Sequence, residues 1–259
     1  MMAKIIAISN QKGGVGKTTT AINLSASLAV ADRKVLLVDI DPQGNATAGL
    51  GVNREVLAAS IYEALIQKRA LPDLVLKTGV ERLDLVPAKV DLVGAEVELV
   101  DMPGRETRLK EALAKVVECY DYIFIDCPPS LGLLTINALM AAHSVLVPVQ
   151  CEYYALEGLG QLLKTVQRVR QTLNPSLALE GILLTMFDMR NNLCNQVARE
   201  IQEHFDRRVF QTIVPRNVSL AEAPSHGGPV LLYDIASRGA QAYLQIAKEV
   251  IRYAEKGIR

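Results

Sequence analysis

The chain has 259 residues, half of them hydrophobic, and 28 basic residues balance 28 acidic ones. This length and hydrophobic content favour one large folded domain with a buried core and exclude a disordered chain. The charge balance argues against a protein that coats nucleic acid through bulk positive charge. Residues 160–259 nevertheless contain 13 Lys or Arg and 9 Asp or Glu. This excess of positive charge is compatible with a modest basic face in the C-terminal part.

The cysteines and the hydropathy pattern narrow the class of protein further. The four cysteines show no C-x-x-C spacing and no neighbouring histidine pair: Cys119, Cys127, Cys151 and Cys194. Neither a zinc site nor a disulfide framework is therefore indicated. The chain opens on a strand-like run, and no apolar stretch approaches 18 residues. We expect a cytoplasmic protein that does not enter a membrane.

Short apolar runs alternate with segments of helical periodicity along the whole chain. The runs expected to form strands are 5–8, 35–38, 83–86, 122–125, 145–148, 181–184 and 209–213. The segments expected to form helices are 19–31, 56–68, 106–118, 133–142, 156–173, 195–205 and 239–255. Uninterrupted apolar runs indicate strands buried on both faces. The alternation predicts a single domain over residues 1–259, built as a doubly wound, mainly parallel sheet with helices on both faces.

A glycine-rich segment joins the first expected strand to the first expected helix. Its glycines allow the loop to curl so that backbone N–H groups converge on phosphate oxygens, and the helix N-terminus favours the negative charge. Lys17 is placed to reach the β- and γ-phosphates, and the Thr18 hydroxyl to hold Mg²⁺. The residues expected to bind the nucleotide here are Lys12, Gly13, Gly14, Val15, Gly16, Lys17, Thr18 and Thr19. The sequence therefore predicts ATP and Mg²⁺ as cofactors.

Three aspartates follow the ends of expected strands. Asp39 and Asp41 lie on the same side of an extended segment after the second strand, beside the glycine-rich loop. Such a pair suits water positioning and the metal shell of a triphosphate, although capping of the next helix is the alternative for an Asp before Pro. Asp126 ends the strand at 122–125, and a buried acid there needs a partner such as Mg²⁺ with its waters.

The glycine-rich segment also departs from the common P-loop pattern. Gln11 stands where the first glycine is usual, and Lys12 precedes Gly13 and Gly14. The resulting K-G-G-V-G-K-T-T-T resembles the deviant P-loop of the ParA/MinD family of ATPases. Residues 39–45 and 127–132 look like the two switch segments of that family. Further segments resemble its chromosomal Soj-type branch: 148–150, 152–158, 185–188, 215–218 and 220–225.

The resemblance implies roles for individual residues at the phosphates. By this resemblance Lys12 crosses a dimer interface to the ATP of the partner subunit, although a solvated loop charge is the alternative. Lys12, Lys17 and Asp41 are then the catalytic residues, with Asp41 orienting the attacking water. Thr18, Asp39 and Asp126 are expected to support Mg²⁺.

The resemblance also implies sites for the nucleoside and for DNA. The nucleoside is expected beside Met186, Pro215 and Asn217. Arg190 and Arg216 are the candidates for nonspecific contact with DNA, with the nucleotide or the interface as the alternative place for Arg216. Related sequences often carry arginine where this chain has Ser219.

The function implied is an ATP-hydrolysing dimerisation switch on the nucleoid. It would bind DNA without sequence preference and partition a chromosome or plasmid with a ParB-like activator. The first alternative is a MinD-like membrane ATPase, which needs an amphipathic C-terminal anchor. Residues 247–259 offer few bulky apolar residues and two acids, so they read as an ordinary last helix. The second alternative is a metabolic enzyme such as dethiobiotin synthetase or the nitrogenase iron protein, whose signatures are not evident here.

Overall fold

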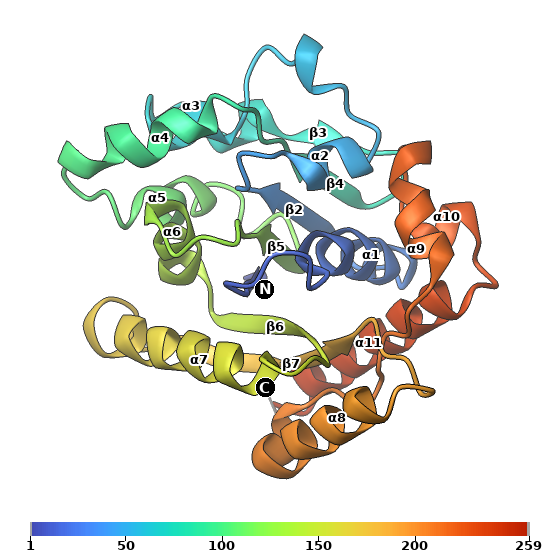
Figure 1. Ribbon diagram of the computed structural model, residues 1–259. Helices are drawn as coiled ribbons and strands as arrows, with labels where there is room; N and C mark the ends of the chain where they lie inside the picture. The colour runs from blue at the N-terminus through green and yellow to red at the C-terminus, as the bar shows by residue number, and fades with distance from the viewer. Residues whose placement is uncertain (1, 258–259) are drawn as a thin grey trace.

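A computed structural model describes residues 2–257, and the strands of this part of the chain form one seven-stranded sheet (Figure 1). The strands are β1 (Lys4–Ile8), β2 (Val35–Asp39), β3 (Leu76–Lys77), β4 (Leu83–Val86), β5 (Tyr122–Asp126), β6 (Ser144–Gln150) and β7 (Ala178–Thr185). Their order is β3-β4-β2-β5-β1-β6-β7, and only the β3–β4 pairing in it is antiparallel. The predicted mainly parallel sheet is therefore confirmed.

Helices cover both faces of this sheet. They are α1 (Lys17–Val30), α2 (Asn45–Gly49), α3 (Ile61–Leu65), α4 (Leu92–Glu98), α5 (Arg108–Leu113), α6 (Leu133–Ala141), α7 (Ala155–Thr172), α8 (Asn192–Phe205), α9 (Val218–Glu222), α10 (Val230–Tyr233) and α11 (Arg238–Glu255). Side chains of β1 alternate between two cores: Ile5 and Ala7 pack with α5 to α8, whereas Ile6 and Ile8 pack with α1 and α11 (Figure 1). This double burial explains why the strand sequences lack polar alternation.

The segment 209–213 is not a strand, so that prediction was wrong. It runs beside β7, where the Phe210 N–H donates to the Ile182 carbonyl at 2.9 Å, but only an isolated bridge forms at Val209. The carboxylate of Glu249 on α11 instead accepts the backbone N–H groups of Gln211 and Thr212 at 3.0 and 2.8 Å. The Glu249 side chain thus takes the place of the neighbouring strand that would otherwise accept these N–H groups.

The helices expected at 56–68 and 106–118 are shorter in the structure. α3 begins only at Ile61, because the Ser60 hydroxyl accepts the Tyr62 N–H and the Glu63 carboxylate accepts the Ser60 N–H. This capping box fixes the start of the helix. The strand β3 and the short helices α2, α4, α9 and α10 were not predicted, since two to seven residues give too little periodicity to detect.

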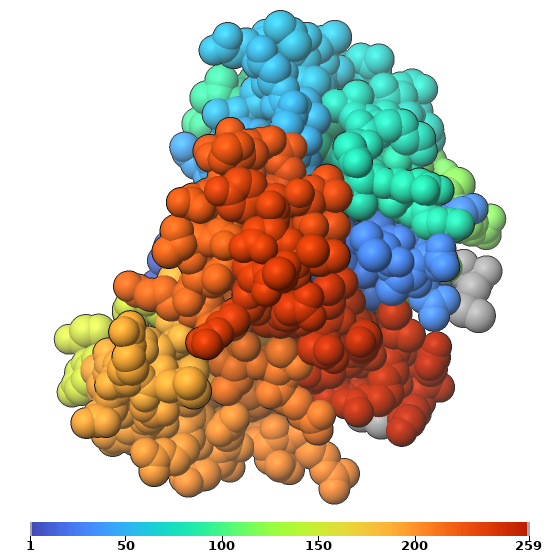
Figure 2. All heavy atoms as spheres, turned by 90° about the vertical axis from the view of Figure 1, so that its right-hand side faces the viewer, coloured from blue at the N-terminus to red at the C-terminus, as the bar shows by residue number. Residues whose placement is uncertain are grey.

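The last helix belongs to the core. Ile246, Val250 and Tyr253 on its inner face are buried, and C-terminal residues drawn in orange and red cover much of the side shown in Figure 2. The segment 247–259, interpreted from the sequence as an ordinary last helix, lies outside the described residues beyond residue 257. Within residues 2–257, none of the helices combines the length and the apolar character needed to cross a membrane.

Candidate nucleotide-binding site

The carboxyl ends of three neighbouring strands meet at the glycine-rich loop. The loop follows β1, while Asp39 ends β2 and Asp126 ends β5. In the sheet register Asp126 lies beside Ile8 on one side and beside Asp39 on the other. The parallel sheet therefore brings together the loop and both aspartates, as ligand sites in such folds require.

The glycine-rich loop is shaped by its glycines and held by two side chains outside it. Gly14 and Gly16 have φ of +72° and +88°, a left-handed conformation that favours glycine. Asn10 accepts the Lys12 N–H at 3.0 Å and donates to the Pro148 carbonyl at 2.7 Å. Thr185 on β7 donates to the Val15 carbonyl at 2.8 Å. Sequence reasoning missed both anchors; only Asn10, an Asx-turn residue two positions before Lys12, carried a local signal.

The two lysines of the loop occupy different environments. Lys17 is only 7% exposed, and its ammonium donates to the Lys12 carbonyl at 3.1 Å. Burial lowers the pKa of Lys17, and the charge of Asp126 opposes this shift. The Lys12 side chain is 41% exposed and forms an ion pair with Glu152 at the start of the α7 region. Glu152 carried no sequence signal that identified it as the partner of Lys12.

Asp39 is fully buried and engaged with the start of α2. Its carboxylate accepts the Thr47 N–H at 2.8 Å, the Thr47 hydroxyl at 2.7 Å and the Asp41 N–H at 3.1 Å. Burial is the largest cause that raises the pKa of Asp39 to about 6. Asp41 is also largely buried, and its carboxylate accepts the Gln43 N–H at 2.9 Å. Asp39 thus orders the segment that positions Asp41.

Asp126 is a fully buried carboxylate. Neither of its oxygens has a partner within ordinary hydrogen-bond geometry in the described chain, although the Thr18 hydroxyl lies close enough to favour its ionised form. Burial, and then the charge of Asp39, raises the pKa of Asp126 well above its ordinary value. An orphaned carboxylate beside Lys17 and Thr18 fits a Mg²⁺ ion or its waters.

The protein by itself does not supply a complete set of Mg²⁺ ligands in the described part of the chain. Residues 2–257 contain no cluster of three or more His, Cys, Asp or Glu side chains that could hold a metal ion. Mg²⁺ commonly takes one or two protein oxygens and completes its shell with water and phosphate oxygens. Thr18 and Asp126 match that pattern, whereas the lone pairs of Asp39 are largely occupied.

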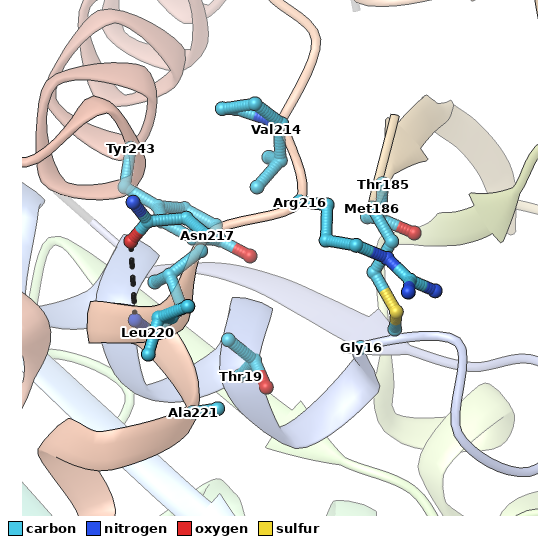
Figure 3. A pocket seen from close by; sticks show the side chains of 12 residues that line it. Gly16, Thr19, Thr185, Met186, Val214, Arg216, Asn217, Leu220, Ala221 and Tyr243 are labelled. Atoms are coloured by element: carbon cyan, nitrogen blue, oxygen red, sulfur yellow. Dashed lines mark hydrogen bonds between the residues drawn. The ribbon is translucent and has the colours of Figure 1, made fainter. Parts of the chain in front are cut away.

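An apolar hollow of about 350 Å³ adjoins the loop (Figure 3). Five of the residues predicted to bind the nucleotide line it: Gly16, Thr19, Met186, Pro215 and Asn217. Arg216, for which the nucleotide was one alternative place, lines it too, and sequence reasoning missed the remaining six: Thr185, Val214, Val218, Leu220, Ala221 and Tyr243. The Met186 and Arg216 side chains lie at the Gly16 end of the hollow in Figure 3. Its size and lining suit a nucleoside.

The two arginines predicted to contact DNA lie in different places. Arg216 lines the hollow, which matches the alternative place considered for it. Arg190 is exposed after β7, and its guanidinium makes two hydrogen bonds of 3.0 Å to the Asp188 carboxylate. The hydrogen bonds from Arg190 lower the pKa of Asp188 to about 2, so this pair stays charged at neutral pH. Ser219 donates to Asp234 at 3.1 Å.

Comparisons with known proteins agree with this geometry. A family model described as an AAA domain matches residues 3–179. The chain is 59% identical to the sporulation initiation inhibitor protein Soj of Bacillus subtilis, over 96% of this chain and 98% of that protein. It is 58% identical to the chromosome partitioning protein ParA of Myxococcus xanthus, over 97% and 89% of the two chains.

A similar solved structure carries a nucleotide. It is cobyrinic acid a,c-diamide synthase from Mycobacterium smegmatis with bound ADP and magnesium, with a TM-score of 0.87 and 39% identity. The similarity covers 99% of this chain and 97% of that one. The fold, the phosphate loop and the high identity to named partition proteins lead to one conclusion: the chain belongs to the ParA/Soj family of chromosome-partitioning ATPases, within the ParA/MinD group.

Proposed function

We propose that this protein is one ATPase domain that dimerises when ATP is bound, binds DNA without sequence preference and partitions DNA with a ParB-like activator. The observation that carries the proposal is that the two lysines of the loop occupy different environments. Lys17 is buried inside the loop, whereas Lys12 is exposed and directed away from it to Glu152. One lysine is thus available to the phosphates of its own chain and the other to a facing subunit.

The nucleotide site uses the residues that meet at the sheet edge. Backbone N–H groups of residues 13–18 and the Lys17 ammonium hold the phosphates, and the apolar hollow accepts the nucleoside. Thr18 and Asp126 would hold Mg²⁺, which would neutralise phosphate charge when bound. Asp41 orients the water that attacks the γ-phosphorus, so that ATP and water give ADP and phosphate.

Dimerisation follows from the placement of Lys12. Two facing ATP sites concentrate negative charge where water is excluded, and a lysine donated from each side offsets the repulsion. Lys12 has to leave Glu152 to make this contact. Both side chains of that pair are partly exposed, so an ion pair of this kind is worth only about 0–1 kcal/mol.

The proposed DNA contact is weak in one subunit. Arg190 is exposed but paired with Asp188, and Arg216 lies at the nucleoside hollow. Few phosphate contacts give salt-sensitive binding that ignores sequence, and pairing of two subunits multiplies them. ATP therefore controls DNA binding through dimerisation, which places the protein on the nucleoid only in its ATP form.

Two alternatives predict different behaviour. A MinD-like membrane ATPase would need a free amphipathic C-terminal segment, but α11 buries its apolar face against α1 and the sheet. A metabolic ATPase is favoured only by the name of the similar synthase structure, to which this chain is less identical than to the partition proteins. Turnover that depends on a small acceptor and is unchanged by DNA would support it.

Light scattering after size-exclusion chromatography tests the proposal directly. The protein is expected to be a monomer with ADP and a dimer with ATP and Mg²⁺, and hydrolysis is expected to rise when DNA and a ParB-like protein are added together. The same mass with both nucleotides would contradict the switch. Cosedimentation with phospholipid vesicles in place of DNA would favour the MinD-like alternative.

A further inference from the structure

The α4 region is apolar on two opposite faces. Leu92, Ala95 and Leu99 are buried in the core. On the other side lies a set of exposed valines, here called the valine stripe: Val90, Val93, Val97 and Val100, with 76%, 55%, 73% and 49% of their surfaces exposed. Val93 and Val97 lie four residues apart on α4, so they share one side of the helix; Val90 precedes it and Val100 lies in the 3-10 turn that follows it. A row of exposed apolar side chains on an otherwise amphipathic helix marks an interaction site.

The surroundings of the valine stripe are acidic. Residues 90–104 contain four Asp or Glu residues and no Lys or Arg. Asp91 lies 3.7 Å from the Lys89 ammonium, and Glu98 accepts a hydrogen bond from Tyr62. Neither Glu98 nor Asp101 forms an ion pair with any residue of the described range 2–257. Lys89 and Arg105 flank this stretch, and the Arg105 guanidinium donates to the Val100 carbonyl. The negative charge beside the valine stripe that has no basic partner in residues 2–257 is therefore that of Glu98 and Asp101.

The same helix touches the segment that leads away from the candidate magnesium carboxylate. Glu96 on α4 lies against Gly132, so closely that a side chain at Gly132 would overlap the Glu96 carboxylate. Gly132 precedes α6 and ends the segment 127–132 that follows Asp126. One buried oxygen of Glu96 has no hydrogen-bond partner in the described chain. A shift of α4 would therefore displace the segment 127–132, which follows Asp126.

We propose that the valine stripe and its acidic neighbours form the docking surface for a basic amphipathic segment of a regulatory protein. The apolar side of that segment covers the valines, and its Lys or Arg side chains meet Glu98 and Asp101. Charge complementarity selects this occupant, because a second copy of the same acidic surface and an anionic lipid surface would both be repelled. The regulatory part of this inference rests on the proposed ATPase switch; the docking itself does not.

Peptide binding to the full chain tests the docking surface. Two fluorescent helical peptides, each about 18 residues or five turns long, share a leucine face and carry either lysines or glutamates on the other face. Fluorescence anisotropy is expected to show at least about tenfold tighter binding of the lysine peptide. Val97→Ser and Glu98→Gln are each expected to weaken its binding about three- to tenfold.

Matched variants guard against unspecific binding of a basic peptide. Val56→Ser changes a valine that is 77% exposed outside the stripe, and Glu203→Gln changes an exposed acid on α8; both are expected to keep wild-type affinity. Binding of fluorescent ADP by each variant confirms that it is folded. Equal affinity for the two peptides, or unchanged binding in Val97→Ser, would overturn the proposal.

Two further measurements separate the other occupants. A lower oligomeric mass of Val97→Ser without peptide would assign the stripe to a second copy of the chain. Loss of cosedimentation with phosphatidylglycerol vesicles in that variant would assign it to a lipid surface, and either result would overturn the proposal. If the wild type fails to dimerise with ATP, the proposed switch fails, while the peptide result still decides whether the docking surface exists.

Discussion

Lys12 and Glu152 form an ion pair within one chain, although 140 residues separate them in the sequence. The pair directs the Lys12 side chain away from the rest of the loop. Because both side chains are partly exposed, little free energy is needed to break the pair. In the dimer proposed above, the ATP phosphates of the facing subunit are a stronger partner for the lysine. Glu152 is therefore the partner of Lys12 in the monomer. Mutation of either residue is expected to change how Lys12 divides between Glu152 and the ATP of a facing subunit.

Lys12→Ala is expected to bind ATP within about threefold of the wild type but to remain a monomer, because Lys17 and the backbone still hold its own phosphates. Light scattering with ATP and Mg²⁺ measures the mass. In the matched variant Glu152→Gln the lysine loses its ion-pair partner within the chain. Dimers are therefore expected at a protein concentration no higher than the wild type needs. A normal dimer in Lys12→Ala would leave Lys12 as a solvated loop charge.

Lys17→Ala is expected to weaken ATP binding at least about a hundredfold, since it removes the buried ammonium that binds the phosphates in the proposed site. Isothermal titration calorimetry with ATP and Mg²⁺ measures the affinity. Lys68→Ala, which removes an exposed lysine after α3, is the control and should bind normally. Wild-type affinity in Lys17→Ala would remove the basis of the proposed nucleotide site.

Asp41→Ala is expected to bind ATP normally and to slow hydrolysis at least about a hundredfold, because a water-orienting carboxylate acts chiefly in the transition state. The trapped species should be a dimer. Phosphate release and light scattering are the two readouts. Hydrolysis at the wild-type rate would transfer the water-orienting role to another group.

Asp39→Asn is expected to act on folding rather than on the chemical step. The amide would present N–H donors where three donors now converge on the carboxylate, which should lower the free energy of unfolding by about 2–3 kcal/mol. Urea denaturation measures the change, and Asp32→Asn at an exposed turn is the control. Unchanged stability of Asp39→Asn would show that these hydrogen bonds do not hold α2.

Asp188→Asn is expected to strengthen DNA binding in the presence of ATP, and Arg190→Glu to abolish it. Loss of the Asp188 charge frees the Arg190 guanidinium for phosphate, and charge reversal repels DNA. Filter binding over a salt series measures both affinity and the number of phosphate contacts. Arg82→Glu, before β4 and across the sheet from β7, should bind as the wild type does. Equal binding by all three variants would place the DNA contact elsewhere.

His143 is expected to make the fold sensitive to acid. Its Nδ1 accepts the Ile5 N–H at 3.0 Å, which needs the neutral ring, and partial desolvation of this otherwise exposed residue lowers its pKa. A lowered histidine pKa contributes stability that is present above the ordinary value near 6.5 and is lost as the pH falls. The stability advantage of the wild type over His143→Asn should therefore shrink between about pH 7.5 and 5.5 in urea denaturation. A constant difference would contradict this origin.

The sequence by itself determined the sheet and the phosphate loop. Apolar runs of strand length and the motif from Lys12 to Thr19 are local patterns, and parallel strands bring Asp39 and Asp126 to the same edge without further information. The strand ends therefore predicted which residues meet at the glycine-rich loop. Met186 and Pro215 were expected beside the nucleoside only through resemblance to a family; the structure shows that both line the hollow next to the loop.

Only the tertiary structure decided which side chains those residues meet. Glu152 reaches Lys12, Thr185 reaches the phosphate loop, and Glu249 takes the N–H groups that would have made 209–213 a strand. Each contact joins residues far apart in the sequence, where periodicity and local spacing carry no information. The orphaned carboxylate of Asp126 likewise depends on what surrounds it in space, because a strand-end aspartate has the same sequence whether or not it is partnered.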